Sequence, residues 1–507
     1  MNKNLKFNLI YLLTLLPLLL SVKNSFGKII DSGRIKAGIV KVSGKITSPG
    51  TTNKNDIVVS ITVLHPITGE NVQYKSPVNT LGHYSIDVEV ETDVSMIAFS
   101  TNVNSEKMLL FKLKHDSEAN IDVSYTRDND IEKIAVKPEM MSNDVLRGFD
   151  DINKMESYRS GRPIEPLYSK STDHFFNFVN TILSERLSIV KNDSLISQEL
   201  KNLISYDYRL YIYTTYVFDY NQFMTLNYKN FNRDTTNKPD IQKIDRTYFR
   251  FLKDFNLNDQ KYLQCFNFPD FQLGLLQNEI LNLPMIEDQD IPSWQKKIKS
   301  ILAGLVGFDK GNYYDILTAN AYARQLNEMV KPLTDKQKEN ISRYWKNGEI
   351  AKILFRKNQK VTEQNNGKTP AVINDISAVP DDKVMETILS KYKNKVVFID
   401  LWATWCVPCL EAMKQFRTTK NSYHGKDVVF VYLTNGSSPR KLWEEKIVGI
   451  GDEQYYLKAS QWNYIMEHFG FGAIPSYLLY NKEGKLINKF TAFPGANEVG
   501  EMIKGLL

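Results

Sequence analysis

Apolar and polar residues alternate along the chain between residues 28 and 138, with turn-forming residues at short intervals. Residues 84–90 show the pattern best, because every second side chain is apolar and the others are Ser, Asp and Glu. Residues 59–63 repeat it and are followed by a turn-forming segment at residues 66–69. A period of two places successive side chains on opposite faces of a strand. The pattern predicts a β-sandwich domain over residues 28–138.

The period changes to three and four over residues 139–360. Trp294 and Ile298, for example, fall on the same face of a helix together with the apolar residues that follow them. Thr334 and Gln337 have the spacing of a capping box, which predicts the start of another helix. We therefore expect a helical middle domain.

A third pattern covers residues 361–507. A polar stretch at residues 362–368 comes first, and residues 396–399 form a continuous apolar run, which is typical of a strand buried on both faces of a sheet. Helices and strands are then expected to alternate: a helix from Cys406, a strand over residues 428–433, a helix capped by Ser438, a helix near Trp462, a hairpin over residues 477–480 and 486–490, and a last helix. This order predicts an α/β layer structure.

The first 27 residues have the features of a secretory signal. Lys3 and Lys6 precede an apolar run over residues 9–20, and Ser25 and Gly27 provide small residues at the first and third positions of a cleavage site. We expect export to the periplasm or the cell envelope. If the signal is not cleaved, the run would instead anchor the chain in a membrane. No cysteine follows the run, which excludes a lipoprotein anchor.

Composition and charge exclude several classes of protein. Hydrophobic residues make up 42% and charged residues 24%, as in ordinary globular chains. The net charge of +6 comes from basic residues spread along the chain, so nucleic-acid binding is not indicated. Three cysteines in an exported chain of 507 residues do not form a disulfide framework. Cys265 stands alone, and we interpret it as a buried apolar side chain.

The other two cysteines carry the candidate chemistry. Cys406 and Cys409 are spaced as C-x-x-C, between the apolar run and the predicted helix. Unpaired N–H groups at a helix N-terminus stabilise a thiolate, and two thiols one turn apart can close a disulfide. Haem attachment would need His in place of Leu410, and zinc would need further ligands, for which only His424 and His468 are near in the sequence. We therefore predict thiol-disulfide exchange without a cofactor or a metal.

The segment Trp-Ala-Thr-Trp-Cys-Val-Pro-Cys at residues 402–409, together with Gly-Ala-Ile-Pro at residues 472–475, resembles the thioredoxin superfamily. The similarity is greatest to the TlpA-like envelope thiol-disulfide oxidoreductases and covers residues 371–507. It implies that Cys406 is the nucleophile and Cys409 the resolving thiol. It also implies that Asp400 is a buried carboxylate that exchanges a proton with Cys409.

The resemblance also predicts a substrate-binding surface around the dithiol. Pro475 would follow a cis peptide bond, and the backbone of the residue before it would pair with an extended substrate segment. The residues expected to contact substrate are Trp405, Val407, Pro408, Ile474 and Pro475.

The chain departs from the family just after the dithiol. Many relatives have Glu and Pro three and five residues after the second cysteine, whereas this chain has Ala412 and Lys414. We expect a straighter helix here, without the contribution of that Glu to the thiols.

Three functions remain open from the sequence. The first is an exported reductase of protein disulfides, which would exchange electrons with protein or peptide thiols and be recharged by an upstream dithiol donor. The second is a dithiol oxidase that introduces disulfides. The third is a binding or assembly protein that uses its C-terminal domain as a substrate clamp.

Overall fold

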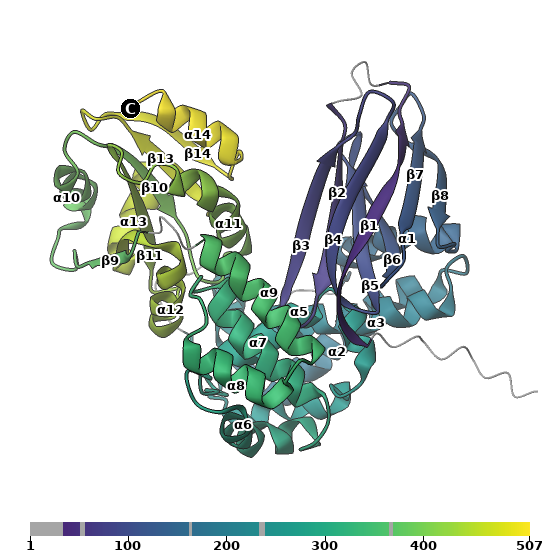
Figure 1. The fold of residues 1–507 in the computed structure, drawn as a ribbon. Helices are drawn as coiled ribbons and strands as arrows, with labels where there is room; N and C mark the ends of the chain where they lie inside the picture. The colour runs from purple at the N-terminus through teal and green to yellow at the C-terminus, as the bar shows by residue number, and fades with distance from the viewer. Residues whose placement is uncertain (1–33, 51–55, 162–164, 233–238, 365–368) are drawn as a thin grey trace, which may run out of the picture.

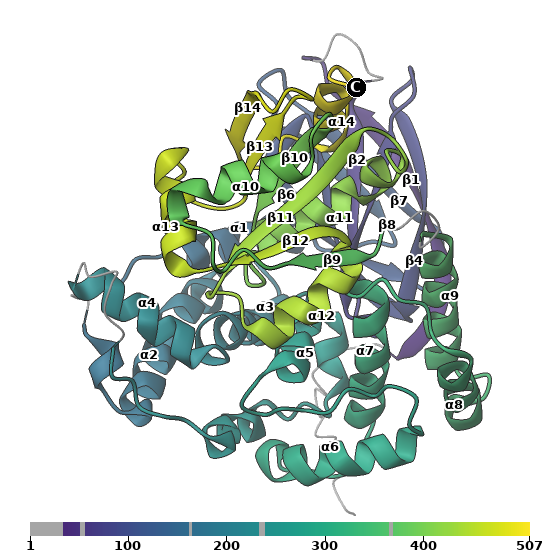
Figure 2. The ribbon, with the colours of Figure 1, turned by 90° about the vertical axis from the view of Figure 1, so that its left-hand side faces the viewer.

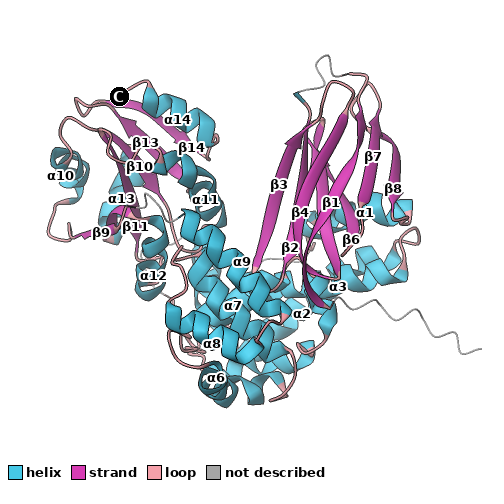
Figure 3. Ribbon diagram, viewed as in Figure 1, coloured by secondary structure: helices cyan, strands magenta, loops and turns pink. Residues whose placement is uncertain are grey.

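The computed structural model describes residues 34–50, 56–161, 165–232, 239–364 and 369–507 (Figure 1). Strands concentrate at the two ends of the chain and helices lie between them (Figure 3). We refer to residues 35–137 as the two-sheet region, residues 142–364 as the helical region and residues 371–504 as the C-terminal region. The two β-rich regions stand side by side on the helical region (Figure 1). The predicted signal at residues 1–27 lies outside the described residues.

The two-sheet region consists of two four-stranded sheets with the orders β4-β1-β7-β8 and β3-β2-β5-β6. The alternation seen in the sequence places the apolar side chains of both sheets in one shared core. All neighbouring strands are antiparallel except β1 and β7, which are parallel. The strands are β1 (Ile35–Thr47), β2 (Val58–His65), β3 (Glu70–Pro77), β4 (His83–Thr92), β5 (Val94–Thr101), β6 (Asn104–Lys114), β7 (Ala119–Tyr125) and β8 (Ile131–Lys137).

The helical region buries a large core that is rich in aromatic side chains. Its main helices are α1 (Ser142–Ser157), α2 (Thr172–Asn192), α3 (Gln198–Ile212), α4 (Tyr220–Asn232), α5 (Phe268–Gln277), α6 (Ile291–Val306), α7 (Tyr313–Asn327), α8 (Asp335–Trp345) and α9 (Glu349–Gln364). The predicted capping box is confirmed, since the Thr334 hydroxyl accepts from the backbone N–H of Gln337 and the Gln337 side chain accepts from that of Thr334. Cys265 is fully buried with a free thiol, as predicted.

The C-terminal region contains a six-stranded sheet with the order β14-β13-β10-β11-β12-β9. Strand β9 pairs with β12, β12 with β11 and β11 with β10, and all these pairs are parallel. Strand β13 pairs antiparallel with β10, and β14 pairs antiparallel with β13. Every residue of β10 is buried, as the continuous apolar run predicted. The strands are β9 (Ala371–Asn374), β10 (Val396–Leu401), β11 (Val428–Asn435), β12 (Asp452–Leu457), β13 (Ser476–Tyr480) and β14 (Leu486–Thr491).

Helices cover both faces of this sheet. Figures 1 and 2 together show that α11 and α14 lie on the face turned toward the two-sheet region, while α10 and α13 lie on the opposite face. Each face has its own apolar core. The helices are α10 (Val384–Lys391), α11 (Val407–Asn421), α12 (Arg440–Ile450), α13 (Ala459–His468) and α14 (Ala496–Lys504).

Helix α12 fixes the C-terminal region to the helical region. The Lys446 ammonium donates to the Glu328 carboxylate over 2.6 Å, and Arg324 pairs with Glu445. Gly449 packs so closely that a Cβ atom there would lie 1.8 Å from the carbonyl oxygen of Glu328. The two regions therefore meet in a tight contact of backbone atoms and buried ion pairs.

Two expectations need correction. Ser438 was expected to cap a helix, but α12 begins at Arg440 with Pro439 before it, and the Ser438 hydroxyl instead accepts from the backbone N–H of Thr404. The helical region was expected to end at residue 360, whereas α9 continues to Gln364 and takes up the first part of the predicted linker. A polar segment that directly follows a helix can continue that helix, so polarity alone does not predict a loop there. Among the described residues, no helix is both long and apolar enough to span a membrane.

Candidate active site

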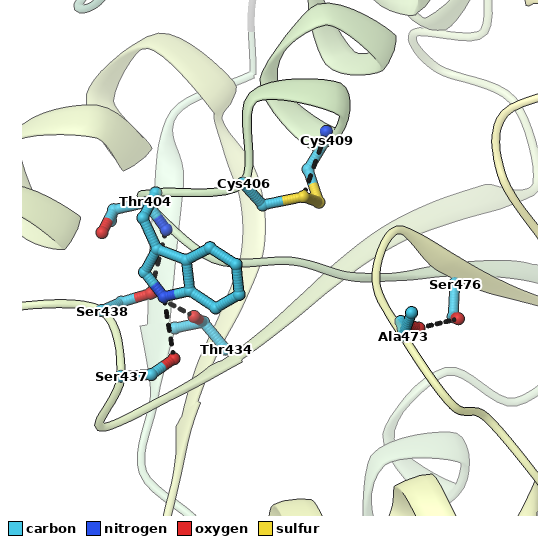
Figure 4. Close-up of a disulfide and its surroundings, with 9 residues drawn as sticks. Thr404, Cys406, Cys409, Thr434, Ser437, Ser438, Ala473 and Ser476 are labelled. Atoms are coloured by element: carbon cyan, nitrogen blue, oxygen red, sulfur yellow. Dashed lines mark hydrogen bonds between the residues drawn. A yellow bond between two sulfur atoms is a disulfide. The ribbon is translucent and has the colours of Figure 1, made fainter. Parts of the chain in front are cut away.

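The two cysteines lie at the N-terminus of α11 and are joined by a disulfide bond (Figure 4). Cys406 is the residue that precedes the helix, and its sulfur accepts from the backbone N–H of Cys409 over 3.3 Å. Pro408 lies in the first turn, where its missing N–H leaves no helical hydrogen bond unmade. A thiolate at Cys406 in the reduced protein would face the same N–H group and the positive end of the helix.

The surface around the disulfide is apolar and open to solvent. The side chains of Trp405 and Val407 are 45% and 67% exposed, and Pro408 is exposed as well. Cys406 is 3% exposed and Cys409 is fully buried. A partner would therefore reach Cys406 more easily than Cys409, which agrees with the predicted order of the two thiols.

Asp400 is buried in strand β10, which precedes the dithiol in the chain. Its pKa lies well above the ordinary value because burial removes the carboxyl from water, and the charge of Lys420 opposes that rise only in part. One carboxyl oxygen has no hydrogen-bond partner among the described residues. A carboxyl with a raised pKa is suited to hold and exchange a proton.

Lys420 brings a cation to this buried site from the far end of α11. Its ammonium donates to Asp452 over 2.6 Å. Burial lowers the pKa of Lys420, and the nearby Asp452 and Asp400 carboxylates act against this decrease. Sequence reasoning missed Lys420, because nothing in the sequence indicates that the last turn of the helix approaches Asp400.

The loop between β11 and α12 supports the segment just before Cys406. The indole N–H of Trp405 donates to the Ser437 hydroxyl over 3.1 Å, and the backbone N–H of Thr404 donates to the Ser438 hydroxyl over 3.0 Å (Figure 4). Ser438 is fully buried and also bonds the Thr434 hydroxyl. Neither serine was identified from the sequence as part of the site.

In the view of Figure 4, the segment before β13 lies on the opposite side of the dithiol from Ser437 and Ser438. The peptide bond between Ile474 and Pro475 is cis, as predicted. Ile474 is half-buried and contacts the cores on both faces of the sheet. The carbonyl oxygen of Pro475 accepts from the backbone N–H of Ala492, which ties this segment to the end of β14. Ile474 therefore packs against the same apolar core that contains Cys406 and Cys409.

No group of three or more His, Cys, Asp or Glu side chains that could hold a metal ion occurs within the described part of the chain.

Comparisons with known proteins concern this same part of the chain. Residues 365–503 match the Redoxin family model. The thiol-disulfide oxidoreductase ResA of Bacillus cereus is 24% identical over 116 residues, which cover 23% of this chain and 66% of the relative. ResA of Geobacillus thermodenitrificans is 29% identical over 98 residues, which cover 19% of this chain and 55% of the relative. The chain thus spans less than two thirds of the length of either relative.

Two solved structures are also similar. A putative thiol-disulfide oxidoreductase from Bacteroides vulgatus is 30% identical, and the match covers 24% of this chain and 83% of that chain with a TM-score of 0.20. StoA from Bacillus subtilis is 19% identical, and the match covers 22% of this chain and 82% of that chain with a TM-score of 0.19.

Proposed function

Because residues 365–503 form a domain of the thioredoxin superfamily that is TlpA-like, we propose that this chain is a thiol-disulfide oxidoreductase that reduces protein disulfides. The observation that carries the proposal is the disulfide between Cys406 and Cys409 at the start of α11, in the same domain as the buried carboxyl of Asp400. A nucleophilic thiol, a resolving thiol and a proton acceptor are the groups that disulfide exchange needs.

The reaction begins with the reduced dithiol. The Cys406 thiolate attacks one sulfur of the substrate disulfide, which forms a mixed disulfide and releases the first substrate thiolate. Asp400 takes the proton from Cys409, and the Cys409 thiolate then attacks the sulfur of Cys406. The second substrate thiolate leaves as the internal disulfide closes. The substrate gains two electrons, and an upstream dithiol donor returns them to the enzyme.

The substrate would bind on the apolar surface around the dithiol. Trp405, Val407 and Pro408 provide its exposed part. The half-buried Ile474 would provide the opposite side, and the buried Pro475 would hold the backbone of Ile474 in place. Such a surface suits an extended protein or peptide segment that carries a disulfide, because apolar contacts and backbone pairing do not require one particular sequence.

Insulin reduction tests this proposal. The full chain with dithiothreitol as electron donor should reduce the insulin disulfides with repeated turnover, and Cys406→Ser should abolish the gain over dithiothreitol alone. Binding of insulin without turnover would instead indicate a binding protein that uses its C-terminal domain as a substrate clamp. The reduction potential then decides the direction: a value near about −270 mV fits a reductase, and a value near about −120 mV would make the chain an oxidase.

The proposal includes a location and a division into domains. Residues 1–27 would act as an export signal, which places the dithiol in the periplasm or the cell envelope. Residues 28–138 would form a β-sandwich, and the residues from 139 to the end of α9 at Gln364 would form a helical domain. The two together would carry the catalytic domain. Mass spectrometry of the mature protein tests the location: an intact Met1 in a soluble cytoplasmic fraction would contradict export.

A further inference from the structure

We propose that Ser437 is a positioning residue that orients Trp405 for contact with protein substrates. The inference rests on the proposed function and adds to it a determinant of substrate binding outside the dithiol motif. Trp405 is a large aromatic side chain, 45% exposed, next to the nucleophile Cys406. The bond from its indole N–H to the Ser437 hydroxyl, 3.1 Å long, restricts how the ring can turn.

The hydrogen bonds of Ser437 define its role as an acceptor. Its hydroxyl donates to the side-chain oxygen of Asn435 over 2.7 Å, and its backbone N–H donates to the same oxygen over 3.0 Å. A serine hydroxyl has one proton and two lone pairs. Because the proton is directed to Asn435, a lone pair remains for the Trp405 N–H. Asn435 thus fixes the serine in the orientation that the tryptophan needs.

The loop that carries Ser437 is itself held firmly. The neighbouring Ser438 is buried, and its carbonyl oxygen accepts from the Tyr456 hydroxyl over 2.6 Å. Helix α12 follows at once and is fixed to the helical region through Lys446 and Gly449. The support of Trp405 therefore continues from the edge of the dithiol to the helical region, which gives that region a connection to the active site.

A tryptophan held in this way favours the binding of large substrates. Ordering a free side chain on binding has an entropic cost, and a ring that is already fixed avoids most of that cost. Tryptophan is also among the residues that most often contribute strongly to protein interfaces. The bond between Trp405 and Ser437 is exposed to solvent and contributes little to the stability of the fold, so its loss should affect binding more than folding.

The test uses the full chain and insulin as the substrate. Ser437→Ala should raise KM for insulin about three- to tenfold, the range that corresponds to one hydrogen bond, while kcat changes less than twofold. Ser437→Thr keeps the hydroxyl and should restore the original KM. Ser460→Ala, which removes the exposed hydroxyl that donates to Asp381 elsewhere in the C-terminal region, is the matched control and should leave both constants unchanged.

A double-mutant cycle shows whether Ser437 acts through Trp405. Trp405→Phe keeps an aromatic ring but lacks the N–H, so adding Ser437→Ala to it should raise KM no further. If Ser437→Ala raises KM equally in the unmodified chain and in Trp405→Phe, or does not raise it in the unmodified chain, the inference is overturned. Time-resolved fluorescence anisotropy, taken as the difference from Trp405→Phe, should show faster motion of Trp405 in Ser437→Ala, and unchanged motion would also overturn it.

The same experiment separates this inference from the function on which it rests. If the unmodified chain does not reduce insulin, the proposed function and this inference both fail. If the unmodified chain is active and Ser437→Ala has the same KM, the function stands and only the positioning role is lost.

Discussion

The ammonium of Lys414 lies 3.7 Å from the carboxylate of Glu70, and this ion pair links the helix that carries the dithiol to the first residue of strand β3. Glu70 also pairs with Lys357 of α9 over 2.5 Å. One carboxylate therefore contacts all three regions of the chain. Lys414 therefore serves a contact between regions of the chain.

The two lysines that bind Glu70 should differ in their effect on stability. Lys414 is about half exposed and its contact is long, so Lys414→Ala should cost less than about 1 kcal/mol. Lys357→Ala should cost clearly more, because it removes the nearer partner of a carboxylate that is only 12% exposed. Thermal unfolding of both variants at neutral pH measures the order. A larger loss for Lys414→Ala would contradict it.

The loss of stability in Lys357→Ala should depend on pH. Burial raises the pKa of Glu70, but the charges of Lys357 and Lys414 outweigh this and hold it below the ordinary value of 4.5. A lowered pKa in the folded state gives stability that is present above the unfolded pKa and is lost as the pH falls through the folded pKa. The penalty of Lys357→Ala should therefore shrink when unfolding is measured below pH 4.5.

Gly449→Ala should have opposite effects in two settings. In the full chain a Cβ atom would lie 1.8 Å from the carbonyl oxygen of Glu328, so the variant should lower the unfolding temperature or loosen the contact between the regions. In a fragment that begins at residue 369 this neighbour is absent. Alanine should then stabilise α12 by up to about 1 kcal/mol, since glycine is a poor helix former.

The fragment should fold, since its six strands and both cores lie within residues 371–507. Calorimetry on the full chain and the fragment, each with and without Gly449→Ala, measures both effects. A change in stability of the same sign in the full chain and in the fragment would mean that the close contact with Glu328 does not determine the effect of the substitution. Gly436→Ala offers a control, because no atom outside its neighbours lies within 4 Å of a Cβ there.

The sequence predicted the C-terminal region well because its signals are local. The motif around Cys406 and Cys409, the apolar run of β10 and the Ile-Pro pair each lie in a few consecutive residues, and each is found where it was expected. The eight strands of the two-sheet region were recognised only as a pattern. Alternation gives the face of a strand but not its partner, so the parallel pairing of β1 with β7 was not foreseen.

What the sequence did not predict are contacts between residues far apart in the chain. Glu70 and Lys414 are two charged residues among many, and no spacing marks them as partners. Ser437 and Ser438 follow a strand, where serine is a common turn residue. This position led us to expect a helix cap at Ser438, and not support of the segment before Cys406.

The two thiols should be distinguishable by trapping. If Cys406 attacks and Cys409 resolves, Cys409→Ser should accumulate mixed disulfides with partner proteins, because the buried resolving thiol is lost and the nucleophile remains. Cys406→Ser should accumulate few. Non-reducing gels followed by mass spectrometry measure the difference and identify the partners. Equal trapping by both variants would refute the assignment, and Cys265→Ser should behave like the unmodified chain.

The last prediction concerns Asp400 as the proton acceptor for Cys409. Burial holds its pKa well above the ordinary value, which suits the carboxyl to exchange a proton with a thiol. Asp400→Asn should slow the resolution of the mixed disulfide at neutral pH and leave the first attack by Cys406 unchanged, because the helix N-terminus already favours that thiolate. The defect should shrink above about pH 8.5, the reference pKa of a thiol, as Cys409 ionises without help.

Stability gives an independent measure of the same carboxyl. A group whose pKa is raised on folding contributes stability below its unfolded pKa, and this is lost as the pH rises through the folded pKa. Asp400→Asn should therefore gain stability relative to the unmodified chain as the pH rises, whereas the exposed Asp382→Asn should show no such trend. Single-turnover kinetics from about pH 6 to 9, across the reference thiol pKa, decide the catalytic role. If Asp400→Asn resolves the mixed disulfide as fast as the unmodified chain throughout, Asp400 is not the acceptor, and a stability trend alone would show only that its burial is costly.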